Sequence, residues 1–275
     1  GILGFAAAVD CMGDISQSAA YVAELRGALL DKIRDIDNLF VNIVTYEGSN
    51  LSNVSEVFRK NENKGGFNSL IRVGELNVNN GHVIVWNQNK KPRPQGMDYS
   101  HIDVDGIALS LSEMSFDGDT ITGYLNKLSA SEKSGFVIDE FSSDSMFCVS
   151  SREIDFKNLI VKTHETSLDL DLNFSYDDYK SFNKFVDSIT ICADIRPSQL
   201  TLSDLRFFAP TMAKMTDTLQ INGLIEGEVC DFNATDFCFS FKDSTEFYGN
   251  IRMEGLPKFS ETYIDATLFE HLKMS

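Results

Sequence analysis

Apolar and polar residues alternate with a period of two along much of the chain. The clearest example is 168–174 (LDLDLNF), where every second residue is Leu or Phe. Residues 237–242 (FCFSFK) repeat the pattern. Because successive side chains of a strand point to opposite faces, this alternation predicts strands with one apolar and one polar face. Such half-buried strands are typical of antiparallel sheets.

Short turn signals separate the predicted strands. Residues 79–81 (NNG) predict a hairpin between strands at 71–78 and 82–86, and 117–119 (DGD) predict another. Residues 222–223 (NG) and 248–250 (YGN) are interpreted as turns in the same way. At typical strand lengths, this punctuation gives about fifteen strands.

Helical patterns are few. Residues 17–33 carry apolar side chains at helical spacing, 50–60 predict a short helix, and 203–215 begin like a helix that Pro210 interrupts. The predicted fold class is therefore mainly β, with a few short helices.

Composition and charge narrow the function classes. The chain of 275 residues is 43% hydrophobic and 24% charged, as in folded proteins. Its 41 acidic residues against 24 basic ones give a net charge of −17, which argues against nucleic acid as a partner. The one basic cluster, 87–96 (NQNKKPRPQG), is interpreted as a solvated loop.

Candidate chemistry is sparse. The four histidines lack metal-ligand spacing, and the chain has no nucleophile elbow, P-loop or dinucleotide fingerprint. Asp169 and Asp171 share one strand face and are interpreted as solvated. Cys148, Cys192 and Cys238 lie in apolar runs and are predicted to be small core side chains. We therefore expect no catalytic residue, no metal and no cofactor, and we do not expect an enzyme.

The apolar strand faces have to be removed from water. A second sheet can cover them in a sandwich, the sheet can close into a barrel, or an open trough can be covered by lipid chains. Composition alone favours the sandwich. The candidate lining residues of a trough are Ile84, Leu168, Leu170, Leu172, Phe174, Phe237, Phe239 and Phe241.

Several stretches, taken in order, resemble the AsmA/TamB-like periplasmic proteins in the form found in Bacteroidota. They include strand pairs, a "SEKSGF" turn and an "LSDLRFFAP" unit, and they span residues 21–43, 71–86, 128–141, 154–172, 202–230 and 251–259. The resemblance implies a long curled antiparallel sheet with an apolar groove, of the β-taco type. It also implies a bridge-like lipid-transfer and outer-membrane biogenesis function, in which phospholipid acyl chains lie along the groove.

The resemblance further implies a periplasmic location with an inner-membrane anchor, and an outer-membrane assembly partner reached through a C-terminal region that this chain lacks. The chain is interpreted as a fragment. Residues 1–32 form a leading strand or helix after a missing anchor, and 33–275 form one continuous sheet. The alternatives are a β-sandwich or solenoid surface module that binds glycan or protein, and a structural spacer. The sandwich and the trough differ in whether the faces of 168–174 and 237–241 meet a second sheet.

Overall fold

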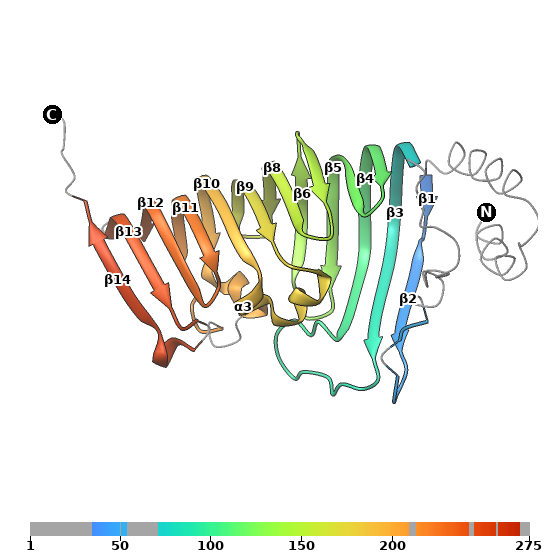
Figure 1. Ribbon diagram of the computed structural model, residues 1–275, viewed down its shortest axis with the longest axis horizontal. Coiled ribbons are helices and arrows are strands. Elements are labelled where there is room, and N and C mark those ends of the chain that lie inside the picture. Colours follow the sequence, from blue (N-terminus) through green and yellow to red (C-terminus); the bar gives the residue numbers. More distant parts are fainter. Residues whose placement is uncertain are drawn as a thin grey trace, which may run out of the picture. The chain divides into compact units, whose positions relative to one another are not determined.

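The computed structural model describes residues 35–49, 51–53, 71–208, 213–241, 245–256 and 258–269. They form a single 14-stranded sheet (Figure 1). The strands are β1 (Asp35–Asp37), β2 (Phe40–Thr45), β3 (Ile71–Asn87), β4 (His101–Asp117), β5 (Thr120–Glu132), β6 (Val137–Ser143), β7 (Met146–Val149), β8 (Glu153–Lys162), β9 (Ser167–Ser175), β10 (Thr190–Thr201), β11 (Thr218–Glu228), β12 (Asp231–Phe241), β13 (Thr245–Glu254) and β14 (Tyr263–Leu268).

Helical segments are short and lie in the connections. They are the 3₁₀ turns η2 (Tyr179–Lys184), η3 (Leu202–Phe207) and η6 (Phe259–Glu261), and the α-helical turn α3 (Phe185–Ser188). The mainly β prediction is confirmed. Of the predicted helices, only the start of 203–215 is seen, as η3. The leading segment 1–32, the predicted helix at 17–33 and nearly all of that at 50–60 lie outside the described residues.

Strand order follows chain order. From β3 to β14 each strand pairs antiparallel with its neighbours (Figure 1). Strands β6 and β7 both pair with β5 and β8 and together fill the place between them. The exception to the antiparallel prediction is at the first edge, where β1 and β2 both pair in parallel with β3. Connections between successive antiparallel strands therefore alternate between the two margins of the sheet.

The hairpin predicted at 79–81 is wrong, because β3 runs straight through it. Asn80 has a φ of 55°, but this left-handed residue makes a bulge rather than a turn. Its side chain donates to Asn38 beside β1, and Asn79 likewise donates to Asp37. The neighbouring parallel segment thus uses the polar side chains that signalled a turn.

Of the other predicted turns, one is confirmed and two are wrong. The turn at 117–119 is confirmed between β4 and β5, whereas 222–223 and 248–250 lie inside β11 and β13. A side chain at Gly249 would collide with the carbonyl oxygen of Thr267 on β14. Glycine here permits a close approach of two strand backbones and does not reverse the chain.

Bulges keep the apolar residues on one face. In β8 the register shifts between Phe156 and Leu159, at Asn158, which has a φ of 49°. In β12 it shifts between Ala234 and Phe237. Each bulge adds one residue, so apolar side chains three positions apart point the same way.

Two clusters of buried side chains form the core, both on this face. One centres on Leu159, Leu170 and Ile221, and the other on Met114, Leu125 and Phe147. Phe141 and Phe156 pack against both clusters. The apolar surface is therefore continuous from β3 to β12.

Candidate functional site

Seven of the eight predicted lining residues lie on the apolar face. Five of them are members of the first cluster or pack against it: Leu168, Leu170, Leu172, Phe237 and Phe239. Phe174 stands opposite Ile154 and Ile191, and Phe241 stands opposite Leu219. Directly opposite residues share a face, so β9 and β12 present these side chains to the same side.

Ile84 is not brought together with the others. It stands opposite Asn42 of β2 and Asp103 of β4, so its side chain lies on the polar side of the sheet. Its neighbours Val83 and Val85 carry the apolar face in β3. The bulge at Asn80 accounts for the difference, because an extra residue reverses which positions of a strand point inward.

The sequence pattern did not predict every residue of the apolar face. Leu159, Ile195 and Ile221 are in its buried centre. They were missed because bulges in β8 and β10 interrupt the alternation around the first two. In β8 the sequence feature at the bulge is an Asn in mid-strand, followed by apolar alternation in the other phase, whereas the β10 bulge contains Arg196 and Pro197.

Exposure across the face is graded. Leu159 is 0% and Leu170 is 6% exposed, whereas Leu168, Leu172 and Phe239 are only half-buried. All described strands belong to one sheet, so the cover over Leu159 comes from side chains of its own face. A flat single layer cannot give such cover, and the face must therefore curve inward around Leu159. The ring of Phe185 from α3 packs against Phe174, 5.7 Å between centroids, and covers that end of β9.

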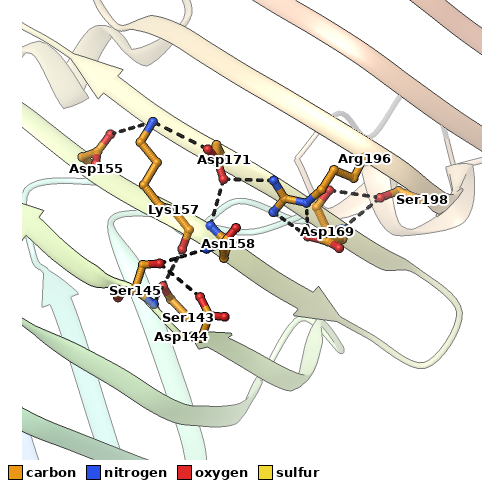
Figure 2. Close-up of polar contacts among 10 residues, drawn as sticks. All are labelled: Ser143, Asp144, Ser145, Asp155, Lys157, Asn158, Asp169, Asp171, Arg196 and Ser198. Carbon is orange, nitrogen blue, oxygen red and sulfur yellow. Dashed lines mark hydrogen bonds and ion pairs between the residues drawn. The ribbon is translucent and has the colours of Figure 1, made fainter.

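The opposite face is polar and ion-paired. Figure 2 shows Arg196 of β10 reaching two carboxylates of β9, with Nε 2.6 Å from Asp169 and Nη1 3.1 Å from Asp171. Lys157 lies 3.7 and 3.8 Å from Asp155 and Asp171. The Asp169–Asp171 pair, interpreted from sequence as solvated, is therefore the anchor of a network that joins three strands.

The same network satisfies backbone groups that the bulges leave unpaired. The Asn158 N–H donates to Asp171 Oδ1 at 2.8 Å, and Ser198 Oγ accepts the Asp169 N–H at 2.9 Å (Figure 2). In β12 the Asp236 N–H donates to Asn250 Oδ1 of β13 at 3.0 Å. Polar side chains of one face thus hold the bulges that orient the apolar face.

The cysteine prediction is wrong. Cys192 is exposed and stands opposite Asn173 and Glu226, while Cys148 stands opposite Asp155 and Cys238 opposite Asn222. All three are on the polar side, because they occupy the alternate positions of strands whose other positions are apolar. The four cysteines within the described ranges are free thiols. Partial desolvation of the sulfur, followed by the nearby carboxylates of Glu153 and Glu226, raises the pKa of the Cys148 and Cys192 thiols, which keeps them protonated at neutral pH.

Two cavities lie away from the predicted lining residues. One, of about 260 Å³, is between residues 92–101 and 132–134, and the other, of about 320 Å³, is beside Arg196 and Asp169. Among the described residues, no group of three or more His, Cys, Asp or Glu side chains could hold a metal ion. No helix in that same part of the chain has the length and apolar character needed to cross a membrane.

Comparison with protein-family models, curated proteins and solved structures gives no match for this chain. The resemblance to AsmA/TamB-like proteins remains a prediction from sequence.

Proposed function

We propose that this chain binds phospholipid acyl chains along the apolar face of its sheet. One observation carries the proposal: apolar side chains from β3 to β12 share one face, and the described strands supply no second sheet to cover it. The sandwich alternative needs such a sheet. A glycan-binding surface would need polar groups on this face rather than Leu and Phe.

The energetics favour an apolar ligand in extended contact. Half-buried Leu and Phe side chains keep apolar area exposed to water, at about 25 cal/mol per Å². An acyl chain gains about 0.8 kcal/mol for each methylene that it buries. Contact over many methylenes is needed to outweigh the lost freedom of the chain. A long row of side chains such as Leu168, Leu172, Phe237 and Phe239 offers that contact.

The broader assignment is a bridge-like lipid-transfer protein of AsmA/TamB type in the periplasm. Support comes from the ordered sequence stretches and from the long, one-sided sheet. In this proposal the sheet is passive: acyl chains lie on its apolar face and headgroups stay in water. The membrane anchor and the outer-membrane assembly partner belong to the proposal on the strength of the resemblance alone.

The test is mass spectrometry of lipid extracted from the chain after purification without detergent. Phe247 and Tyr248 of β13 form a matched pair, because they are neighbours on opposite faces. Phe247 stacks on Phe239 at 5.2 Å, whereas Tyr248 stands opposite Cys238. We expect phospholipid from the wild type, a clear loss in Phe247→Ser, and wild-type amounts in Tyr248→Ser.

Circular dichroism confirms that each variant is folded before lipid is measured. Leu170 is avoided because its 6% exposure makes a polar residue there destabilising whatever the ligand. A folded wild type that carries no phospholipid, or an equal loss in both variants, would contradict the proposal.

A further inference from the structure

A polar cavity lies at one margin of the sheet, where the β3–β4 connection meets the β5–β6 turn. Residues 92–96, Asp98 and His101 line it from the first, and 132–134 line it from the second. The β5–β6 turn is tied to strand β4 by a hydrogen bond from the Lys133 N–H to the Asp103 carbonyl oxygen. The Met97 N–H donates to the carbonyl oxygen of Phe207, which fixes the connection to η3. The basic loop 87–96, predicted to be solvated, is exposed at residues 88–95, and the chain directly after it is anchored to η3 through Met97.

The carboxylates of this cavity are used internally. Asp98 accepts from the N–H groups of Arg93 and Ser100, and from Nδ1 of His101 at 2.8 Å. The other ring nitrogen of His101 lies 3.0 Å from the Asn87 carbonyl oxygen. Both carboxylate oxygens of Asp98 and both ring nitrogens of His101 are therefore hydrogen-bonded within the protein.

Glu132 is engaged in the same way. One of its carboxylate oxygens accepts from the Asp103 N–H at 3.3 Å and the other from the Ser134 N–H at 2.7 Å. Glu132 is 6% exposed, so these backbone amides are its environment. The two carboxylates that line the cavity are thus hydrogen-bonded within the protein.

The donors of the cavity are left over. Ser134 Oγ is buried and has no hydrogen-bond partner. In the described ranges, no carboxylate pairs with the Arg93 guanidinium or the Lys133 ammonium, and Lys133 lies over the Trp86 ring at 5.4 Å. The second cavity differs, because its one cation, Arg196, is already paired with Asp169 and Asp171. Ser134 Oγ is thus a buried donor without an acceptor, and it lines the same cavity as two exposed cations that lack a carboxylate partner, so an acceptor-rich ligand would satisfy all three.

We propose that this cavity binds a phosphate group, held by Arg93, Lys133 and the Ser134 hydroxyl. A phosphate offers oxygens to a guanidinium, an ammonium and a hydroxyl together. The volume of about 260 Å³ is below that of a typical pocket for a drug-sized ligand, which suits one small anionic group. The net charge of −17 opposes anions at long range, so recognition depends on these local donors.

The phosphate can belong to a phospholipid headgroup or to a soluble phosphate ester. Two exposed aromatic side chains lie beside the cavity residues. Trp86, 39% exposed, contacts the His101 ring, and Tyr99, 55% exposed, lies between Asp98 and His101 in the chain. Aromatic rings with a polar tip suit a lipid headgroup layer. The headgroup source rests on the proposed function, whereas phosphate binding itself does not.

The first experiment titrates inorganic phosphate into the whole chain by calorimetry, after lipid is removed. We expect saturable binding by the wild type, weakened about tenfold in Arg93→Ala, because a hydrogen bond to a charged group is lost. Ser134→Ala should weaken binding without lowering thermal stability, since its buried hydroxyl has no partner within the protein and removing it relieves a desolvation cost. Lys91→Ala is the matched control, because Lys91 is exposed in the same loop but does not line the cavity.

No saturable binding by the wild type would overturn the proposal. An equal loss in Lys91→Ala and Arg93→Ala would do so as well, because it would mean that loop charge alone attracts phosphate. The second arm adds dihexanoyl phosphatidylglycerol below its micelle concentration. Displacement of phosphate supports the headgroup source, and phosphate binding without displacement supports a soluble ester. Loss of co-purified lipid in Phe247→Ser is independent of all these results, so the proposed function and the phosphate site can fail separately.

Discussion

Asn158 and Asp236 occupy mid-strand positions with φ angles of 49° and 48°. A β-branched residue rarely adopts this left-handed conformation, whereas Asn and Asp tolerate it. In both bulges a side chain of the next strand accepts the bulged N–H: Asp171 in β9 and Asn250 in β13. Two residues, one providing the backbone angle and one the acceptor, thus set which side chains of a strand face the apolar side.

Asn158→Val should therefore destabilise the fold by about 1–3 kcal/mol, the usual cost of a strained backbone angle. Asn158→Gly should cost less, because glycine adopts a positive φ freely and only the bond from Asn158 Nδ2 to Ser145 Oγ is lost. Urea unfolding of both variants measures the difference. Equal destabilisation by Val and Gly would show that the backbone angle is not the constraint.

Asp171 gives a pH-dependent prediction. Burial raises the pKa of Asp171, but the hydrogen bonds from the Asn158 N–H and Arg196, with the charges of Arg196 and Lys157, outweigh burial and lower it. A lowered pKa stabilises the fold above the unfolded value of about 3.9, and this contribution is lost as the pH falls through the folded pKa. The wild type should exceed Asp171→Asn in stability near about pH 7, and the gap should close below about pH 4.

Asp171→Ala separates charge from capping. Asn at position 171 keeps an oxygen that can accept the Asn158 N–H, whereas Ala leaves that amide without its acceptor. We expect Ala to be the less stable variant at neutral and at acid pH. A gap between wild type and Asp171→Asn that does not change with pH would refute the role of the ion pair.

At the scale of the element, uninterrupted alternation was the most informative signal. β9 was predicted almost to its ends because 168–174 contain no bulge. The sequence predicted two strands in place of β3, because an Asn-Gly pair with a left-handed Asn80 occurs in a bulge as well as in a turn. Local sequence cannot distinguish the two, since the outcome depends on the β1 segment that pairs alongside.

The candidate site follows the same rule. Seven of the predicted lining residues lie on the apolar face because they come from stretches, 168–174 and 237–241, where the phase of the alternation holds. Ile84 lies beyond a bulge and points to the polar side. The cysteines were misplaced for a related reason, because short apolar runs hide which positions point inward. The phosphate cavity could not be predicted at all, since it depends on which acceptors the fold leaves engaged.

Within one face, burial predicts different effects for the same substitution. Leu159→Ala should cost about 2–5 kcal/mol, because its side chain is fully covered and leaves a cavity. Leu168→Ala, on the adjacent strand, should cost clearly less, because Leu168 is only half-buried. Urea unfolding of the two variants is the check. Similar costs would mean that the face around Leu168 is as closed as that around Leu159.

At the scale of the molecule, the sheet separates two tasks between its faces. The polar face holds the ion pairs and caps that fix the bulges, and the apolar face gathers the side chains that the bulges orient. Neither face has a second sheet over it within the described ranges. We propose that acyl chains cover the apolar face.

The most direct test places a photoreactive benzophenone residue at position 239 on the apolar face or at 248 on the polar face. Phe239 and Tyr248 are aromatic, half-buried and on adjacent strands, so the two variants differ mainly in the face they report. After irradiation of chain purified without detergent, intact-protein mass spectrometry should show a phospholipid adduct at position 239 and none at position 248. Equal adducts at both positions, or none at position 239, would contradict the account.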